Sequence, residues 1–239
     1  MPAEILRLRT IRTPWVLLAV AQLVIVAGAA GAFANGDRAD PGIARAGAAH
    51  LGLVALFTLV LGIMAVAGEH RHRTITDTYL TQPHRRRVLA DKLAVYTGAG
   101  AVFGVVGAVT ALAATAVAAA ATDVTVDWSD GLLWRTVAGG VGWNIAFAAL
   151  GVGVGARVPN LTAAVTGALA WLALVEGVVA TLVGSTVSQW LPFAAGSALG
   201  NLPSGVDGLP QWGAAALLTG YVAIVGAAAA IVTRRRDIA

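Results

Sequence analysis

The sequence predicts an all-α membrane protein with six transmembrane helices in a single domain, residues 1–239. Hydrophobic residues make up 58% of the chain and charged residues 12%, whereas a soluble domain is about a quarter charged. The apolar residues also gather into long runs. Because lipid offers no hydrogen-bonding partner to the backbone, runs of roughly 20 apolar residues are expected to be helical. The predicted spans cover residues 15–33, 47–68, 93–117, 136–156, 161–183 and 214–232.

The first span, which follows a pre-span segment at residues 1–14, has a signal peptide as its alternative. Three arginines precede the apolar run, and residues 32–34 have the small-x-small form of a cleavage site. The run is longer than a usual signal-peptide core and five more spans follow, so we favour a retained helix. In the pre-span segment, Arg9 and Arg12 fall close to Ile5 on a helical wheel, which makes a weak amphipathic pattern.

The distribution of basic residues predicts the topology. If the N-terminus is cytoplasmic, thirteen of the sixteen Lys and Arg residues fall on the cytoplasmic side, and six of the twelve acids fall outside. Cytoplasmic loops carry such an excess of Lys and Arg, so both termini and the loop at residues 69–92 are predicted to be cytoplasmic. Basic residues spread over short loops suit anionic lipids better than nucleic acid. We therefore expect a multi-pass protein that contacts membrane lipids and binds no nucleic acid.

Common catalytic motifs do not fit this sequence. The only lysine, Lys92, follows Asp91 and precedes Leu93, which excludes a phosphate-binding loop of the Gly-Lys-Ser/Thr type. The run Glu69-His70-Arg71-His72 lacks the spacing of a zinc-protease helix and favours a solvated loop over a metal site. Cysteine is absent, so disulfides and thiolate chemistry are excluded. The chain is predicted to be neither an enzyme nor the holder of a cofactor.

The polar segment between spans 2 and 3 can form a short cytoplasmic helix. Residues 74–82 allow about two turns, with Ile75, Tyr79 and Gln82 along one side, and Pro83 ends the helix. A basic run, Arg85-Arg86-Arg87, follows. Composition alone favours a simpler reading, in which the arginines only anchor the ends of the spans.

The residue pattern of this segment resembles the first cytoplasmic loop of bacterial ABC type-2 transporter permeases, particularly their short six-span type common in actinobacteria. That loop usually reads Glu, Gly-Thr, Leu-Leu-x-x-Pro, Arg and Ala-Lys. The matching positions here are Glu69, Arg73-Thr74, Leu80-Thr81-x-Pro83, Arg86-Arg87-Val88-Leu89 and Lys92-Leu93. The chain departs from the pattern at Arg73, where the family commonly has Gly, and at Asp91, where a small residue is usual. The segments before span 1 and after span 5 also resemble this family.

The resemblance implies an exporter permease of the bacterial plasma membrane. Two permease subunits, identical or paralogous, would pair, and each would contact one of two ABC ATPase subunits, which bind the ATP. The substrate would be a drug, antibiotic, lipid or peptide. The resemblance also implies a coupling helix in the 69–92 loop and short re-entrant helices between spans 5 and 6. The residues expected to couple to the ATPase are Thr74, Ile75, Tyr79, Leu80, Arg85, Arg86 and Arg87.

A second function of another class fits the same residues. The chain would then be a non-transporting anchoring, assembly or immunity protein that uses its basic cytoplasmic loop as a docking site.

Glu176 is the only acidic or basic residue deep within a predicted span. Carboxylates inside a membrane are costly and usually face a bundle interior or a cavity. One reading places Glu176 and Asn144 on the translocation path, with Glu176 at a dimer interface, where it binds a cationic compound. The other, which we favour from sequence, is a protonated or hydrogen-bonded structural glutamate partnered by Asn144 of span 4.

Overall fold

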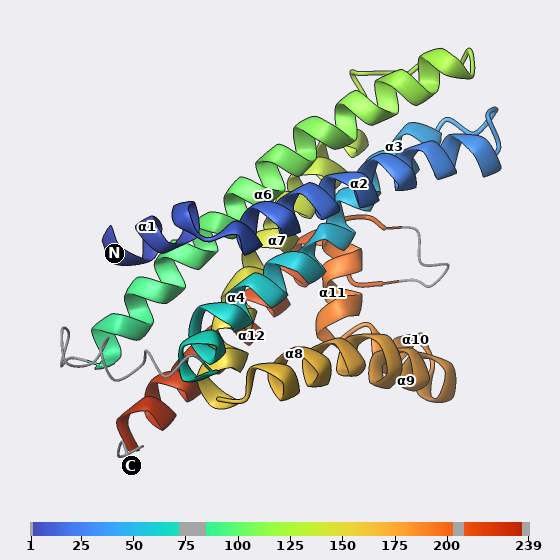
Figure 1. The fold of residues 1–239 in the computed structure, drawn as a ribbon. Helices are drawn as coiled ribbons and strands as arrows, with labels where there is room; N and C mark the ends of the chain where they lie inside the picture. Colours follow the sequence, from blue (N-terminus) through green and yellow to red (C-terminus); the bar gives the residue numbers. More distant parts are fainter. Residues whose placement is uncertain (1, 72–84, 203–207, 236–239) are drawn as a thin grey trace.

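The computed structural model describes residues 2–71, 85–202 and 208–235, and these form helices and no strands (Figure 1). In chain order the helices are α1 (Pro2–Thr10), α2 (Arg12–Asn35), α3 (Ile43–Ala49), η1 (His50–Val54), α4 (Ala55–Arg71), α6 (Arg85–Ala121), α7 (Gly131–Arg157), α8 (Leu161–Ala170), η2 (Trp171–Val175), α9 (Glu176–Val183), α10 (Ser185–Ser188), α11 (Pro192–Leu199) and α12 (Gln211–Arg235).

Six helical stretches are long and apolar enough to cross a membrane, which confirms the predicted number. They are Arg12–Asn35, Ile43–Arg71, Arg87–Ala121, Gly131–Arg157, Leu161–Val183 and Gln211–Ala229. Two of them are composite or irregular: α3, η1 and α4 form the second, while the fifth contains the π-helical turn η2 between α8 and α9. Large apolar side chains such as Leu23, Leu182 and Ile224 remain exposed on these helices, as lipid-facing residues would be.

The predicted boundaries of the loop at residues 69–92 are both wrong, because helix extends into it from each side. Helix α4 continues through Arg71, and α6 begins at Arg85 and runs for 37 residues. At about 1.5 Å per residue, α6 is about 55 Å long and exceeds a hydrocarbon core of about 30 Å. Helix α6 is therefore longer than a membrane span, and the ion pairs described below compensate Glu69 of α4 and Lys92 of α6.

Helices α4 and α7 form the centre of the bundle. The most apolar stretches of the membrane-spanning segments that contain them are 72% and 67% buried. The corresponding values are 22% for the first segment and 11% for the fifth. Glycines bring the two central helices together, since an added Cβ on Gly62 or Gly151 would overlap a carbonyl oxygen of the other helix. Gly100 and Gly104 of α6 likewise lie against α7. Gly100 and Gly104, which are four residues apart and so share a face of α6, thus serve helix packing within this chain.

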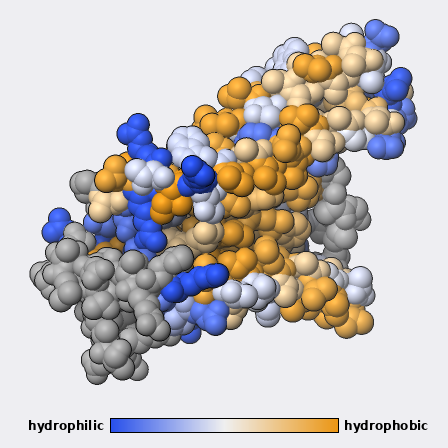
Figure 2. Space-filling model, in the orientation of Figure 1, coloured by the Kyte–Doolittle hydropathy of each residue, from blue (hydrophilic) through white to orange (hydrophobic). Residues whose placement is uncertain are grey.

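The start of α1 and the end of α12 lie at the same end of the bundle, while α9, α10 and α11 lie toward the other end (Figure 1). Polar side chains begin two of the helices. Asp130 Oδ1 accepts a hydrogen bond from Leu132 N at 2.8 Å at the start of α7, and Asn160 Oδ1 accepts one from Ala163 N at 3.0 Å at the start of α8. The predicted helical segment between spans 5 and 6 contains α10 and α11. Orange apolar surface covers the middle of the face in Figure 2, and the polar residues gather mostly toward the ends.

Candidate functional site

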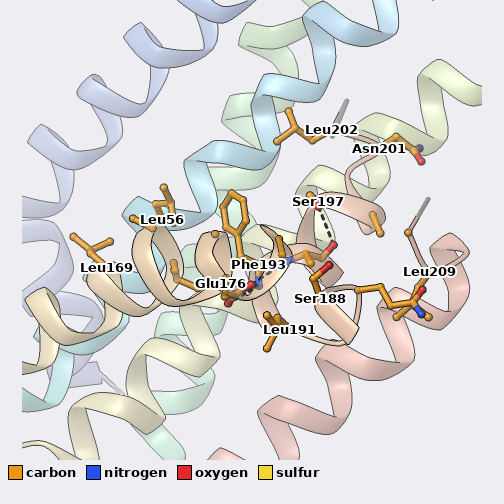
Figure 3. A pocket seen from close by; sticks show the side chains of 18 residues that line it. Leu56, Leu169, Glu176, Ser188, Leu191, Phe193, Ser197, Asn201, Leu202 and Leu209 are labelled. Atoms are coloured by element: carbon orange, nitrogen blue, oxygen red, sulfur yellow. Dashed lines mark hydrogen bonds between the residues drawn. The ribbon is translucent and has the colours of Figure 1, made fainter. Parts of the chain in front are cut away.

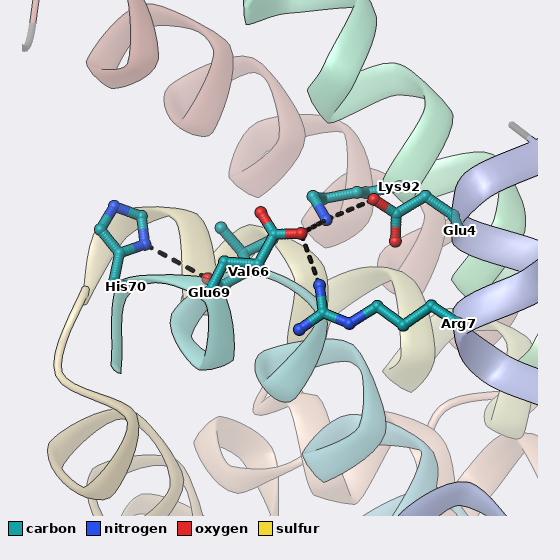
Figure 4. A network of polar contacts seen from close by, with 6 residues as sticks. All are labelled: Glu4, Arg7, Val66, Glu69, His70 and Lys92. Atoms are coloured by element: carbon teal, nitrogen blue, oxygen red, sulfur yellow. Dashed lines mark hydrogen bonds and ion pairs between the residues drawn. The ribbon is translucent and has the colours of Figure 1, made fainter. Parts of the chain in front are cut away.

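Four charged residues form a compact cluster at the end of the bundle that holds α1. Lys92 Nζ lies 2.6 Å from Glu69 Oε1 and 2.5 Å from Glu4 Oε1. Arg7 Nη1 lies 2.5 Å from the same Glu69 oxygen (Figure 4). We call Glu4, Arg7, Glu69 and Lys92 the ion-pair cluster. It joins α1, α4 and α6, which are far apart in sequence.

The ion-pair cluster is mostly shielded from solvent and its formal charges sum to zero. The side chains of Lys92 and Glu69 are only 2% and 4% exposed, and that of Glu4 is 12% exposed. Removing one member of such a buried pair leaves an uncompensated charge, which typically costs about 3–5 kcal/mol. The second carboxylate oxygens of Glu4 and Glu69 are also buried, without a hydrogen-bond partner in the described part of the chain. The cluster therefore depends on every one of its charges.

This cluster corrects the sequence interpretation of the polar segment. Glu69 and Lys92 were expected in a solvated loop, but they lie within helices and are 3% and 2% exposed. His70 Nδ1 lies 3.2 Å from the carbonyl oxygen of Val66, one turn earlier in α4. The sequence does carry one signal: Glu4 and Arg7 are three residues apart, so they share a face of a helix, and from that face Glu4 reaches Lys92 and Arg7 reaches Glu69.

The residues predicted to couple to an ATPase fall in two groups. Thr74, Ile75, Tyr79 and Leu80 lie outside the described residues. Arg85, Arg86 and Arg87 form the first turn of α6, and the side chain of Arg87 is exposed. The ion-pair cluster lies on the two helices that lead into and out of residues 72–84.

A second buried carboxylate, Glu176, lies at the beginning of α9 near the other end of the bundle. Its side chain reaches the N-terminus of α11, where Oε2 accepts hydrogen bonds from Phe193 N at 2.9 Å and Ala194 N at 3.3 Å (Figure 3). Its other oxygen, Oε1, lies 3.1 Å from Phe193 N. The first amide groups of a helix lack partners within the helix and carry partial positive charge. Glu176, the first residue of α9, thus caps the N-terminus of α11.

A cavity of about 1010 Å³ borders this carboxylate. Its walls come from η2 and α9 on one side, from α11 on another, and from Leu56 of α4 (Figure 3). Most of the lining residues are aliphatic, and Phe193 adds an aromatic ring. Among the described lining residues, Glu176 is the only charged one.

Asn144 does not partner Glu176, so that part of the structural interpretation is wrong. Its amide Nδ2 donates to the carbonyl oxygens of Leu51 at 3.2 Å and Gly140 at 2.9 Å. Thr58 Oγ1 also donates to the Asn144 carbonyl oxygen at 3.0 Å. Asn144 is completely buried and is not among the residues that line the cavity. These hydrogen bonds connect η1 and α4 to α7, so Asn144 has a structural role.

A third carboxylate provides an exposed reference. Asp127, in the connection between α6 and α7, accepts hydrogen bonds from Ser129 Oγ at 2.6 Å and Ser129 N at 2.9 Å. The side-chain hydrogen bond, followed by the backbone one, lowers the pKa of Asp127 below its usual value. These contacts shape the turn that leads into α7.

Comparison of the sequence with protein-family models finds no match, and comparison with curated proteins finds none either. The permease resemblance therefore rests on the motif of residues 69–93, on the segments before span 1 and after span 5, and on the predicted topology.

Proposed function

We propose that this chain is the membrane-spanning subunit of an ATP-binding-cassette exporter. Two permease subunits form the translocation path, and a separate ATPase supplies the energy through residues 72–87 of each. Both chain ends and this segment face the cytoplasm of a bacterial cell. The proposal follows from the motif pattern together with six helices able to cross a membrane.

The ion-pair cluster is the observation that supports the proposal most directly. Coupling requires a segment outside the membrane to move membrane helices as a unit, so the helices on both sides of that segment need a rigid connection. Glu69 and Lys92, two residues that carry the resemblance, make that connection across α4 and α6. Arg7 and Glu4 extend it to α1. A displacement of residues 72–84 would therefore act on three helices together.

The coupling residues provide the decisive test. Ile75→Ala combined with Tyr79→Ala removes the apolar anchors proposed to seat in the ATPase. Loss of such anchors typically costs about 2 kcal/mol or more, or at least about a tenfold loss of affinity. We expect the double variant to lose co-purification with the ATPase of a neighbouring gene and to lose transport. Ile11→Ala, an exposed isoleucine at the same end of the bundle, is the matched control and should retain both.

The same experiment separates the alternative function. A docking or immunity protein would still recruit its partner but show no transport in the unaltered chain. Unchanged assembly and transport in the double variant would remove the coupling assignment. Absence of any co-purifying ATPase would favour the docking protein over the exporter.

A further inference from the structure

The cavity beside Glu176 has the size and the chemistry of a ligand site. Its volume of about 1010 Å³ lies at the upper end of the range for pockets that hold drug-sized molecules. Ligand pockets are typically apolar with a few fixed polar groups. Here the aliphatic walls include Leu56, Leu169 and Leu172, and polar groups come from Ser197 and Asn201.

Glu176 is the one group on the described lining of the cavity that can carry a formal charge, and that charge is negative. Glu176 is 4% exposed, and the amides of Phe193 and Ala194 hold its carboxylate in place. These amides contribute only the partial charge of a helix terminus, equivalent to roughly half an elementary charge. Arginine and lysine are absent from the described residues that line the cavity. An ionised Glu176 therefore leaves a net negative charge facing an apolar space.

The occupied carboxylate oxygens restrict the kind of cation that fits. Two backbone N–H groups, those of Phe193 and Ala194, and the Trp171 side chain already donate hydrogen bonds to this carboxylate, which occupies most of its roughly four lone-pair positions. A bare metal ion would need about six oxygen ligands, and no group of three or more His, Cys, Asp or Glu side chains among the described residues could hold one here. A bulky organic cation has no such need, because its delocalised charge is attracted without a direct hydrogen bond. The ring of Phe193, next to Glu176 in Figure 3, adds a face on which a cation can rest.

We propose that this cavity binds lipophilic organic cations and that they are the substrate class of the chain. The transport part rests on the proposed exporter function, whereas binding does not. Glu176 selects for the positive charge of the ligand, and the aliphatic walls bind the hydrophobic groups of the ligand.

A pair of probes with similar shape and opposite charge tests the selectivity. Tetraphenylphosphonium and tetraphenylborate are titrated against the purified full chain in neutral detergent, without any ATPase, and binding to empty micelles is subtracted. We expect saturable binding of the cation at least about tenfold tighter than binding of the anion. Equal affinity for the two ions, or no saturable binding of the cation, overturns the proposal.

Two variants assign the binding to this cavity. Glu176→Gln keeps an oxygen that can accept from Phe193 N but removes the charge, so cation affinity should fall about tenfold while anion affinity does not fall. Ala173→Trp fills space from the η2 wall, leaves the contacts of Glu176 in place, and should abolish saturable cation binding. Cation binding that survives both substitutions contradicts the assignment. If Glu176→Gln does not fold, two results still test the assignment: cation binding by Ala173→Trp, and the preference of the unaltered chain for the cation over the anion.

Because these measurements omit the ATPase, they fail or succeed independently of the exporter proposal. Charge-selective binding without a co-purifying ATPase would support the cavity and remove the transport role. An ATPase complex without charge-selective binding would support the exporter proposal and remove the cation site in the cavity.

Discussion

Glu69 and Glu176 are both almost completely buried, with 3% and 4% of their surface exposed, yet the protein compensates them differently. Glu69 faces two full positive charges, from Arg7 and Lys92, at 2.5 and 2.6 Å. Glu176 faces the backbone amides of Phe193 and Ala194. The first site is formally neutral together with Glu4, whereas the described residues around the second supply hydrogen bonds and no full positive charge.

The difference indicates a different use for each glutamate. A neutral network of ion pairs between three helices has strict geometry and leaves no charge for a ligand, so it suits a mechanical connection. A carboxylate stabilised by a helix terminus keeps its field and borders a cavity, so it suits recognition of a cation. We infer that Glu69 holds helices together and Glu176 faces a substrate.

Breaking the ion-pair cluster should produce the largest effect. Glu69→Ala leaves Arg7 without its described partner and Lys92 with Glu4 alone, so we expect destabilisation of about 3–5 kcal/mol. The measurement is the free energy of unfolding in mixed micelles of neutral detergent and SDS. A loss below about 1 kcal/mol would contradict the buried cluster.

A paired substitution controls for charge. Glu69→Met combined with Lys92→Met removes one charge of each sign and keeps side-chain volume. Arg7 and Glu4 lose their partners in it, but they carry opposite charges and lie one turn apart on α1, so they can pair with each other. The cluster stays formally neutral, and the double variant should therefore be more stable than Glu69→Ala. Coupling to the ATPase should still weaken in it, because flexible apolar chains hold α4 and α6 less strictly than ion pairs do.

Removing the cap at α11 should produce an intermediate effect. Glu176→Ala leaves the Phe193 and Ala194 amides without their acceptor, at a cost of about 1–3 kcal/mol. Glu176→Gln keeps one acceptor oxygen and should lose less. The same unfolding measurement compares the two variants. Equal losses would mean that the charge, and not the hydrogen bonds, stabilises α11.

The sequence predicts the fold better than the sites, for physical reasons. Spans are visible because hydrophobicity is a local property of each run, and all six are found. Glu4 and Glu69 are separated by the first two predicted spans, so their shared partner Lys92 depends on helix packing that no local pattern contains. The partner of Glu176 is a backbone amide group, which every residue except proline carries and which therefore leaves no mark in the sequence.

Asp127 should show the smallest effect and so isolates the contribution of burial. It makes hydrogen bonds as short as those of Glu176, at 2.6 and 2.9 Å, but in an exposed turn. Since its pKa is lowered in the folded state, its stabilisation is present above the unfolded pKa and is lost as pH falls through the folded pKa. Asp127→Asn should therefore change stability less than either Glu176 variant at neutral pH, and the difference from the unaltered chain should disappear in acid. Unfolding curves of both proteins at neutral and acidic pH provide the measurement. An Asp127→Asn loss as large as that of Glu176→Ala would mean that hydrogen bonding alone, rather than burial of the carboxylate, sets the cost at these sites.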